Sequence, residues 1–260
     1  MAVHDAQVIA LAARGAWDSA LVVLEEFQEV EGGSGGAIEA FRLASLGAFY
    51  DALDPARGAE RHERAMAAAV TPEDSAEVIW LGGITAVAAE DLEAARAARD
   101  QLRAIGARSA NHLARGLDAL VLDIGGSRDA ALAELHALVV ATGDSGMQRR
   151  YPCFDPVMRT QLSQWQLEAG NPAEAAVPLL WIESAFNNFS VARGTHTVAS
   201  LVYLQRARVE EARGRNERAI QFYREFLQRY DMPVERHRHL VEEAEAALAR
   251  LAGVMEAGER

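Results

Sequence analysis

The sequence contains no lysine and only one cysteine, Cys153, among its 260 residues. A single cysteine cannot form an intramolecular disulfide, so a disulfide-stabilised scaffold is excluded. It also suits a reducing compartment, and we expect a cytoplasmic protein. No apolar run approaches the roughly 20 residues that a membrane-spanning helix needs. Residues 1–5 lack the basic and apolar segments of a signal peptide, so no membrane partner is expected.

Aromatic residues are also scarce, at 7% of the chain, whereas alanine is abundant with 52 residues. Alanine and arginine favour helices, while aromatic and β-branched residues favour strands. Because half of the residues are hydrophobic, the chain can form a core and is not expected to be disordered. The composition therefore predicts an all-α protein.

Acidic residues outnumber basic ones by 38 to 26, which gives a net charge of −12. Binding to nucleic acid requires clustered positive charge that displaces counterions from phosphates. An acidic chain argues against this, and we expect no nucleic-acid partner. The carboxyl-terminal arginines and Arg149-Arg150 nevertheless form locally basic segments, so an acidic protein partner is compatible with the sequence.

Several helix starts are marked by a capping residue directly before a proline: Asp54-Pro55, Thr71-Pro72, Asp155-Pro156 and Asn171-Pro172. The side chain of the first residue accepts a free backbone N–H, and proline at the first helical position loses no hydrogen bond. Thr71 with Asp74, and Asn171 with Glu174, also fit the capping-box pattern. Pro178 lies inside the helix that begins at Pro172, and we expect it to kink that helix, because it removes the hydrogen bond to the Glu174 carbonyl.

A spaced motif recurs along the chain. Four copies have a glycine followed five residues later by an alanine, and two weaker copies replace the glycine with another residue. The six motifs begin at positions 15, 54, 90, 126, 170 and 214, which are 39, 36, 36, 44 and 44 residues apart. The alanines are Ala20, Ala59, Ala95, Ala131, Ala175 and Ala219. We interpret the glycine as a left-handed turn residue and the alanine as the point where two antiparallel helices approach closely.

These spacings predict a single helical-repeat domain over residues 1–260. Its repeats are expected at about 1–34, 40–70, 76–106, 112–142, 156–186 and 200–231. A helix over 234–252, opened by Pro233, has an apolar side and a charged side. We expect it to cap the end of the repeat array, because a stack of repeats needs a polar outer face at its end.

The last repeat resembles the tetratricopeptide repeat (TPR) family, which has about 34 residues per unit. The resemblance depends on Tyr203, Ala207, Gly214, Ala219, Tyr223 and Phe226. It implies a right-handed α-solenoid of antiparallel helix pairs that binds proteins or peptides. The segment from Tyr203 to about Leu251 also resembles the carboxyl-terminal end of repeat arrays in large bacterial signalling proteins, which implies a role in signalling.

No catalytic pattern fits a helical framework. Residues 32–36 match a G-x-S-x-G motif, but that motif requires a strand-to-helix turn, so we interpret them as a flexible connector. Residues 143–146 resemble the serine segment of chymotrypsin-like proteases, which are β-barrels, so we interpret them as a turn. The seven histidines form no metal-ligand pattern and are interpreted as solvated or loop residues, and Cys153 as a packing residue. We therefore do not expect the protein to be an enzyme or to need a cofactor or metal.

Binding residues follow from the TPR resemblance, because TPR ligands commonly lie on the concave face formed by the first helix of each pair. Transferring the inward positions gives Trp80, Ile84, Thr160, Gln164, Glu168, Leu204, Arg208 and Glu211 as candidate partner-binding residues. Trp80 and Arg208 are the preferred probes, because tryptophan and arginine often dominate interface energetics. The alternative is that Trp80 and the leucines pack between helices.

Two connectors, at about 142–155 and 186–196, are longer than a repeat turn requires. Inserted loops on one side of a repeat array often contact ligands, although packed irregular turns explain them equally well. The favoured function is a protein- or peptide-binding scaffold. The alternative is a regulatory module that senses a peptide or small metabolite. A hydrolase that uses Ser34 or Ser145 is the most distant alternative. The sequence identifies neither the partner nor the oligomeric state.

Overall fold

The computed structural model describes residues 2–31, 35–143, 147–181 and 196–258. Within these ranges all regular structure is helical and no strand occurs. The predicted all-α class is confirmed.

Consecutive helices pack as antiparallel pairs joined by short turns. The described pairs are α1 (Ala2–Ala13) with α2 (Trp17–Glu31), α3 (Gly35–Phe49) with α4 (Pro55–Ala68), α5 (Pro72–Ala88) with α6 (Leu92–Ile105), α7 (Arg108–Ile124) with α8 (Arg128–Thr142), α10 (Phe154–Glu168) with α11 (Pro172–Ala176), and α14 (Ala199–Ala212) with α15 (Asn216–Arg229). The short α9 (Met147–Arg150) lies before α10, and α16 (Arg238–Gly258) follows the last pair. This arrangement confirms the TPR-like paired-helix fold.

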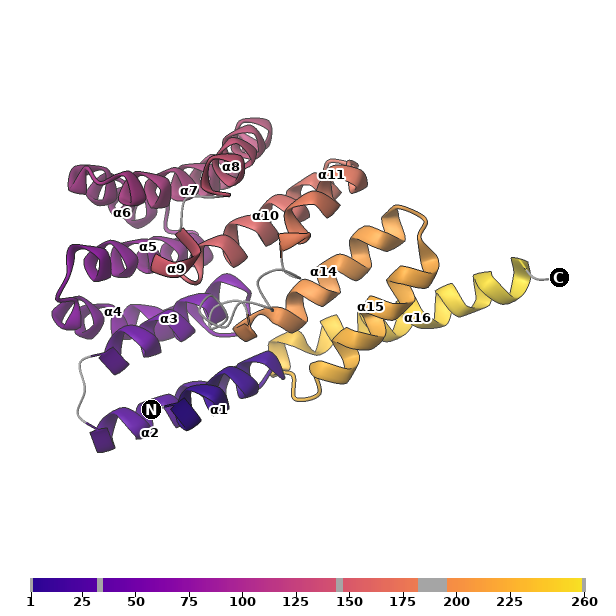
Figure 1. Cartoon of the computed structure of the whole chain (residues 1–260), viewed down its shortest axis with the longest axis horizontal. Helices are drawn as coiled ribbons and strands as arrows, with labels where there is room; N and C mark the ends of the chain where they lie inside the picture. Colours follow the sequence, from indigo (N-terminus) through magenta and orange to yellow (C-terminus); the bar gives the residue numbers. More distant parts are fainter. Residues whose placement is uncertain (1, 32–34, 144–146, 182–195, 259–260) are drawn as a thin grey trace.

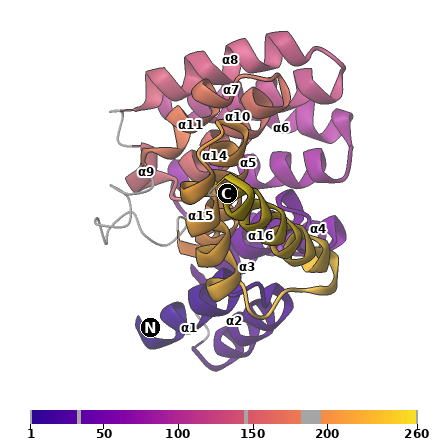
Figure 2. The same cartoon turned by 90° about the vertical axis from the view of Figure 1, so that its right-hand side faces the viewer.

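The pairs do not form an open, extended array. In Figure 1 the first four pairs are stacked from α1 and α2 at the bottom to α7 and α8 at the top. The chain then returns through α10, α14 and α15, and the start of α16 lies beside the end of α1 (Figures 1 and 2). The end of α1 and the start of α16 therefore meet.

The turns within the pairs contain the predicted left-handed residues. Gly15, Gly126, Gly170 and Gly214 have φ values of 92°, 79°, 78° and 70°. Glu90, which stands in the glycine position of a weaker copy, also has a positive φ of 57°. The turn geometry therefore persists where glycine is missing.

The small residues of the motif lie where the helices approach closely. Ala20, Ala95, Ala131, Ala175 and Ala219 are completely buried. Ala59 is exposed, so the predicted register of the second copy was wrong. Its neighbour Gly58 is the buried small residue, and a Cβ atom there would lie 2.8 Å from Cγ2 of Thr85. The register shifts because this turn is longer, with its left-handed residue at Asp51 (φ 59°).

Two of the four predicted caps form. Asp54 accepts the N–H of Ala56 at 2.9 Å, and Thr71 and Asp74 form the predicted capping box. Asn171 does not cap its helix, because its side chain donates to Gln166 instead. Asp155 does not cap either, since α10 already begins at Phe154 and Asp155 is buried in its first turn.

At Pro178, where a kink was predicted, the α-helical hydrogen-bond pattern is interrupted. The α-helix α11 ends at Ala176, and residues Val177–Leu179 form a 3₁₀ helix, η1. Proline has no N–H to donate to the carbonyl four residues earlier, and its ring crowds that carbonyl. The second helix of the fifth pair is therefore interrupted at Val177.

The inward faces of the first helices bury against one another. Trp80 of α5 makes an edge contact with Phe154 of α10, with ring centroids 5.5 Å apart. Arg42 of α3 forms two hydrogen bonds with the Glu77 carboxylate of α5, at 2.8 and 2.9 Å, in a largely buried position. The interior of the curved stack is therefore filled with side chains.

Backbone and ionic contacts join the first turn to the segment after α15. The N–H groups of Met232 and Val234 donate to the carbonyl oxygens of Arg14 and Gly15, at 2.9 and 3.0 Å. The guanidinium of Arg14 forms two 2.7 Å hydrogen bonds with the carboxylate of Asp231. These contacts connect residues more than 200 positions apart and close the stack.

A buried hydrogen-bond chain supports the same closure. The indole N–H of Trp17 donates to the hydroxyl of Tyr230 at 3.3 Å, and that hydroxyl contacts Nδ1 of His237. Nε2 of His237 lies 2.8 Å from the carbonyl oxygen of Tyr50. Because a carbonyl only accepts, Nε2 carries the proton, and Nδ1 accepts from Tyr230. The expectation that all histidines are solvated or in loops was therefore wrong for His237, and it was also wrong for His112, which is buried on α7.

The last helix, α16, starts later than predicted. Pro233 is followed by the 3₁₀ helix η2 (Glu235–His237), and α16 begins at Arg238. Its Ala244, Ala247 and Leu251 are buried against α15, while Glu242, Glu245 and Arg250 are exposed. This two-sided pattern matches the helix expected at the end of the array.

We predict that Ala131→Leu destabilises the protein by about 1–3 kcal/mol, because a larger side chain overpacks the contact of α8 with α7. Ala137→Leu on the same helix is the control, since Ala137 is exposed. Urea unfolding followed by circular dichroism measures both changes. Equal free energies of unfolding for the two variants would contradict the close-approach role of Ala131.

We also predict that acidification weakens the closure at His237. Burial lowers the pKa of His237 below its ordinary value, although the hydrogen bond to Tyr50 opposes this shift. The unfolded chain therefore binds the proton more readily, and stability falls as the pH drops below about 6.5. As the pH is lowered from 8 to 5, the urea midpoint of unfolding should decrease less in His237→Gln than in the wild type. Parallel profiles would show that His237 does not contribute; His62, His112 and His196, whose pKa values are also lowered by burial, account for any remaining slope.

Candidate partner-binding grooves

The predicted concave-face residues divide by accessibility. Trp80 and Ile84 are fully buried, and Leu204 is 2% exposed. These three side chains form part of the core, as the packing alternative describes. The inward face fails to provide a surface at these positions because the curved stack closes on itself.

The polar members of the predicted set already have partners within the chain. Thr160 is buried and bonds the hydroxyl of Tyr50 at 2.8 Å. Arg208 forms two hydrogen bonds with Glu243 of α16, at 2.7 and 2.6 Å. The remaining members pair as follows: Glu211 with Tyr223 and Arg250, Gln164 with Glu168, and Glu168 with Arg128.

Gln164 and Glu168 are exposed at the end of α10. The other six candidate residues, all within the described part of the chain, are buried or half-buried. A binding role for these two residues stays a prediction.

The two long connectors differ in how far the structure describes them. Tyr151, Cys153 and Phe154 of the first are buried, so this part is a packed turn and Cys153 is a packing residue as expected. Residues 144–146 of that connector, including Ser145, lie outside the described residues, as does the side chain of Arg149. Residues 182–195 of the second connector and residues 32–34, including Ser34, also lie outside them.

We predict that Trp80→Ala lowers the free energy of unfolding by about 3–5 kcal/mol, because it leaves a large cavity between α5 and α10. Val140→Ala is the control, since Val140 is 70% exposed and should change stability by less than about 0.5 kcal/mol. Chemical denaturation of both variants measures the difference. If the Trp80→Ala protein were as stable as the wild type, the assignment of Trp80 to the core would be wrong.

Two accessible hollows among the described residues lie on the outer face, between the second helices of neighbouring pairs. One groove of about 590 Å³ runs between α4 and α6, with α5 as its floor. Its lining is mostly small and apolar: Ala56, Ala59, Gly82, Ala86, Ala94, Ala97 and Ala98. His62 packs against Phe41 at one side, with ring centroids 5.4 Å apart. Burial lowers the pKa of His62, which favours its neutral form.

A second groove of about 840 Å³ runs between α6 and α8, with α7 as its floor. Four arginines line it: Arg96, Arg99, Arg103 and Arg115. Asp118 and Glu134 are its acidic residues, so the lining has two more positive than negative charges, although the whole chain has a net charge of −12. Val121, Leu122, Ala130 and Ala133 provide apolar surface beside these charges. We call this the basic groove.

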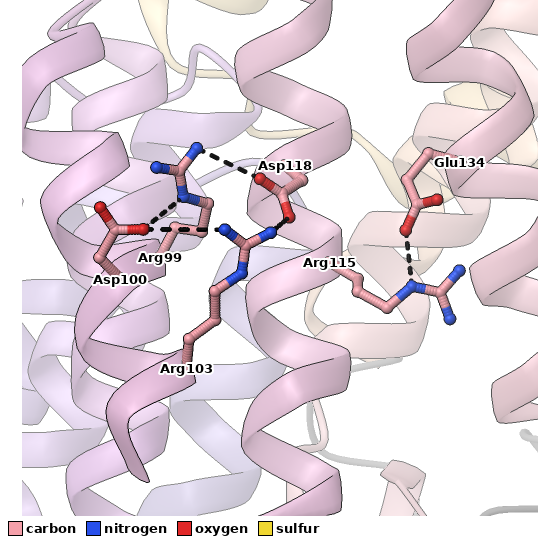
Figure 3. A network of polar contacts seen from close by, with 6 residues as sticks. All are labelled: Arg99, Asp100, Arg103, Arg115, Asp118 and Glu134. Atoms are coloured by element: carbon pink, nitrogen blue, oxygen red, sulfur yellow. Dashed lines mark hydrogen bonds and ion pairs between the residues drawn. The ribbon is translucent and has the colours of Figure 1, made fainter. Parts of the chain in front are cut away.

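The charged side chains of the basic groove form one network between α6 and α7 and a separate pair between α7 and α8 (Figure 3). Asp118 of α7 binds two arginines of α6: its Oδ1 lies 3.3 Å from Nη1 of Arg99, and its Oδ2 contacts Nη2 of Arg103. On α6, Arg99 also donates to Asp100 at 2.9 Å, and this bond holds the pKa of the Asp100 carboxyl below its usual value. These pairs hold the side chains of Arg99 and Arg103 on α6 against α7.

A separate pair lies on the other side of the groove. Nε of Arg115 on α7 donates to the Glu134 carboxylate of α8 at 2.6 Å, and the terminal nitrogens of Arg115 point away from that carboxylate (Figure 3). Arg96 is exposed and forms no ion pair with any residue that the structure describes. The groove therefore retains unneutralised positive charge.

The sequence contains a pattern that indicates the basic groove. The candidate residues taken from the inward positions of the TPR family do not include it. Arg96, Arg99 and Arg103 follow the spacing i, i+3, i+7, which places them on one side of a helix. Asp118 and Glu134 come from neighbouring helices, so only the tertiary structure brings them to this stripe.

Within the described residues, no group of three or more His, Cys, Asp or Glu side chains is arranged to hold a metal ion. None of the helices described there is long and apolar enough to cross a membrane. Burial raises the pKa of the Cys153 thiol, which keeps it protonated and unreactive.

These features define an α-helical repeat protein with grooves on its outer face. No protein-family model matches the chain, and no curated protein has a matching sequence. Among solved structures the chain is similar to PilW, described as a widely conserved type IV pilus biogenesis factor. The two share 14% sequence identity with a TM-score of 0.42, and the match covers 92% of this chain and 97% of the PilW chain. The function is therefore argued from this chain's own residues.

Proposed function

We propose that this protein is a non-catalytic scaffold that binds a protein or peptide through its outer face. The observation that carries the proposal is the basic groove between α6 and α8, which combines excess positive charge with exposed apolar side chains. Repeat proteins commonly use long surfaces of this kind for recognition. The burial of Trp80, Ile84 and Leu204 favours this face over the inward face.

Helix-in-groove recognition is a suitable mechanism for this surface. The second helices form the two walls and the first helix of the next pair forms the floor, so the binding geometry is preformed by packed helices. A preformed site avoids part of the ordering cost of association. The cytoplasmic location inferred from the single cysteine stays a prediction, as does a role in signalling.

A ligand-sensing role is the second candidate, and the apolar groove between α4 and α6 favours it. Its volume of about 590 Å³ falls within the range of small-molecule sites, roughly 300–1,000 Å³, and its lining is largely apolar. His62 and Asp91 are polar groups at this groove. A rise in melting temperature with a peptide or metabolite, lost in Gly82→Leu, would favour sensing.

Site-specific crosslinking tests the scaffold proposal in the native host. We predict that a photoreactive benzoylphenylalanine in place of Ala133, on the α8 wall of the basic groove, forms a covalent adduct of reproducible mass with another protein. The same residue in place of Ala246, which is exposed on α16 away from the groove, should not form that adduct. Mass spectrometry identifies the products. Absence of adducts at Ala133, or the same adducts at both positions, would contradict the proposal.

A further inference from the structure

We infer that the basic groove binds an amphipathic helix that presents carboxylates along one edge and apolar residues along the next. This inference rests on the proposed scaffold function and names the chemistry of its partner. It is carried by the charge distribution and shape of the groove between α6 and α8 (Figure 3).

The arginine stripe determines the carboxylate spacing of the partner. Arg96 and Arg103, at the two ends of the stripe, are seven positions apart on α6, which is about 10 Å along a helix that rises 1.5 Å per residue. A partner helix lying antiparallel to α6 would place carboxylates at i, i+4 and i+7 opposite this stripe. The carboxylate at Arg96 would meet a guanidinium that has no ion pair among the described residues, and the other two would share Arg99 and Arg103 with Asp100 and Asp118. The periods match because both elements are helices.

Asp118 shows how the stripe receives a carboxylate. Its two oxygens contact Arg99 and Arg103 separately, so a single carboxylate bridges arginines one turn apart. Arg96 lies one turn further toward the start of α6 and has no ion-pair partner among the described residues. It therefore provides the open position for a carboxylate supplied by another molecule.

The remaining surface of the groove is suited to apolar side chains. Ala130 and Ala133 are exposed on the α8 wall, and Leu122 is half-buried on the floor. Small alanines leave room for the larger side chains of a docking helix, whose burial would supply most of the binding free energy. Charge along α6 would then select the orientation and the partner.

A peptide fits these features better than a nucleic acid does. Asp118 and Glu134 lie within the groove and would repel a backbone that has a charge on every nucleotide. A peptide can place carboxylates at Arg96 and apolar residues near Glu134. The net charge of −12 adds a long-range repulsion for nucleic acid that a short peptide with few charges largely avoids.

The test uses the full chain and a phage-displayed library of random fourteen-residue peptides, the length of α6. We expect selection to enrich Asp and Glu at helical spacing beside apolar residues. A selected peptide, synthesised with a fluorescent label, should bind Arg96→Glu about tenfold or more weakly than the wild type, because a favourable charge contact becomes repulsive.

Arg64→Glu is the matched control, because Arg64 is exposed on α4, lies outside the grooves and changes the net charge equally. This variant should bind like the wild type, and circular dichroism should show that all variants remain folded. Selected peptides without acidic enrichment, or equal losses in Arg96→Glu and Arg64→Glu, would overturn the inference and leave the scaffold proposal standing. A single-stranded oligonucleotide that binds as tightly, with the same dependence on Arg96, would also overturn it.

Failure to select any peptide would overturn the inference as well. The crosslinking at Ala133 then decides the scaffold proposal separately: an adduct there would retain it, whereas no adduct would remove both.

Discussion

The burial of the inward helix faces against one another is the constraint on which the rest of the structure depends. Trp80 of α5 lies against Phe154 of α10, and the Arg42–Glu77 pair joins α3 to α5 inside the same stack. Once these faces are buried, the helices cannot separate into an open superhelix without exposing large aromatic and aliphatic surfaces to water. The interior is therefore the core of the protein, and Trp80, Ile84 and Leu204 offer no accessible surface there.

Closure of the stack has a second consequence, because it joins the turn after α1 to the segment between α15 and α16. Trp17, Tyr230 and His237 form one buried hydrogen-bond chain, and Arg14 pairs with Asp231 beside it. An open repeat array is stabilised only by neighbouring repeats, whereas this arrangement also couples the first pair to the segment after the last pair.

Local features of the fold were predictable from the sequence. Left-handed turn residues, the caps at Asp54 and Thr71, and the end of α11 before Pro178 all depend on residues close together in the chain. The errors also have local causes: Asn171 bonds Gln166 instead of capping, and a longer turn moved the small residue from Ala59 to Gly58. Helical periodicity alone could not show whether Trp80 faces a partner or another helix of the same chain.

The sequence by itself determined an all-α chain of paired helices, because helix propensity, turn glycines and small residues act over a few positions. Only the tertiary structure decided that the inward faces become the core, since that depends on the curvature accumulated over all the pairs. The same holds for the basic groove. The stripe of Arg96, Arg99 and Arg103 is visible in the sequence, but its pairing with Asp118 and its position beside α8 depend on helix packing.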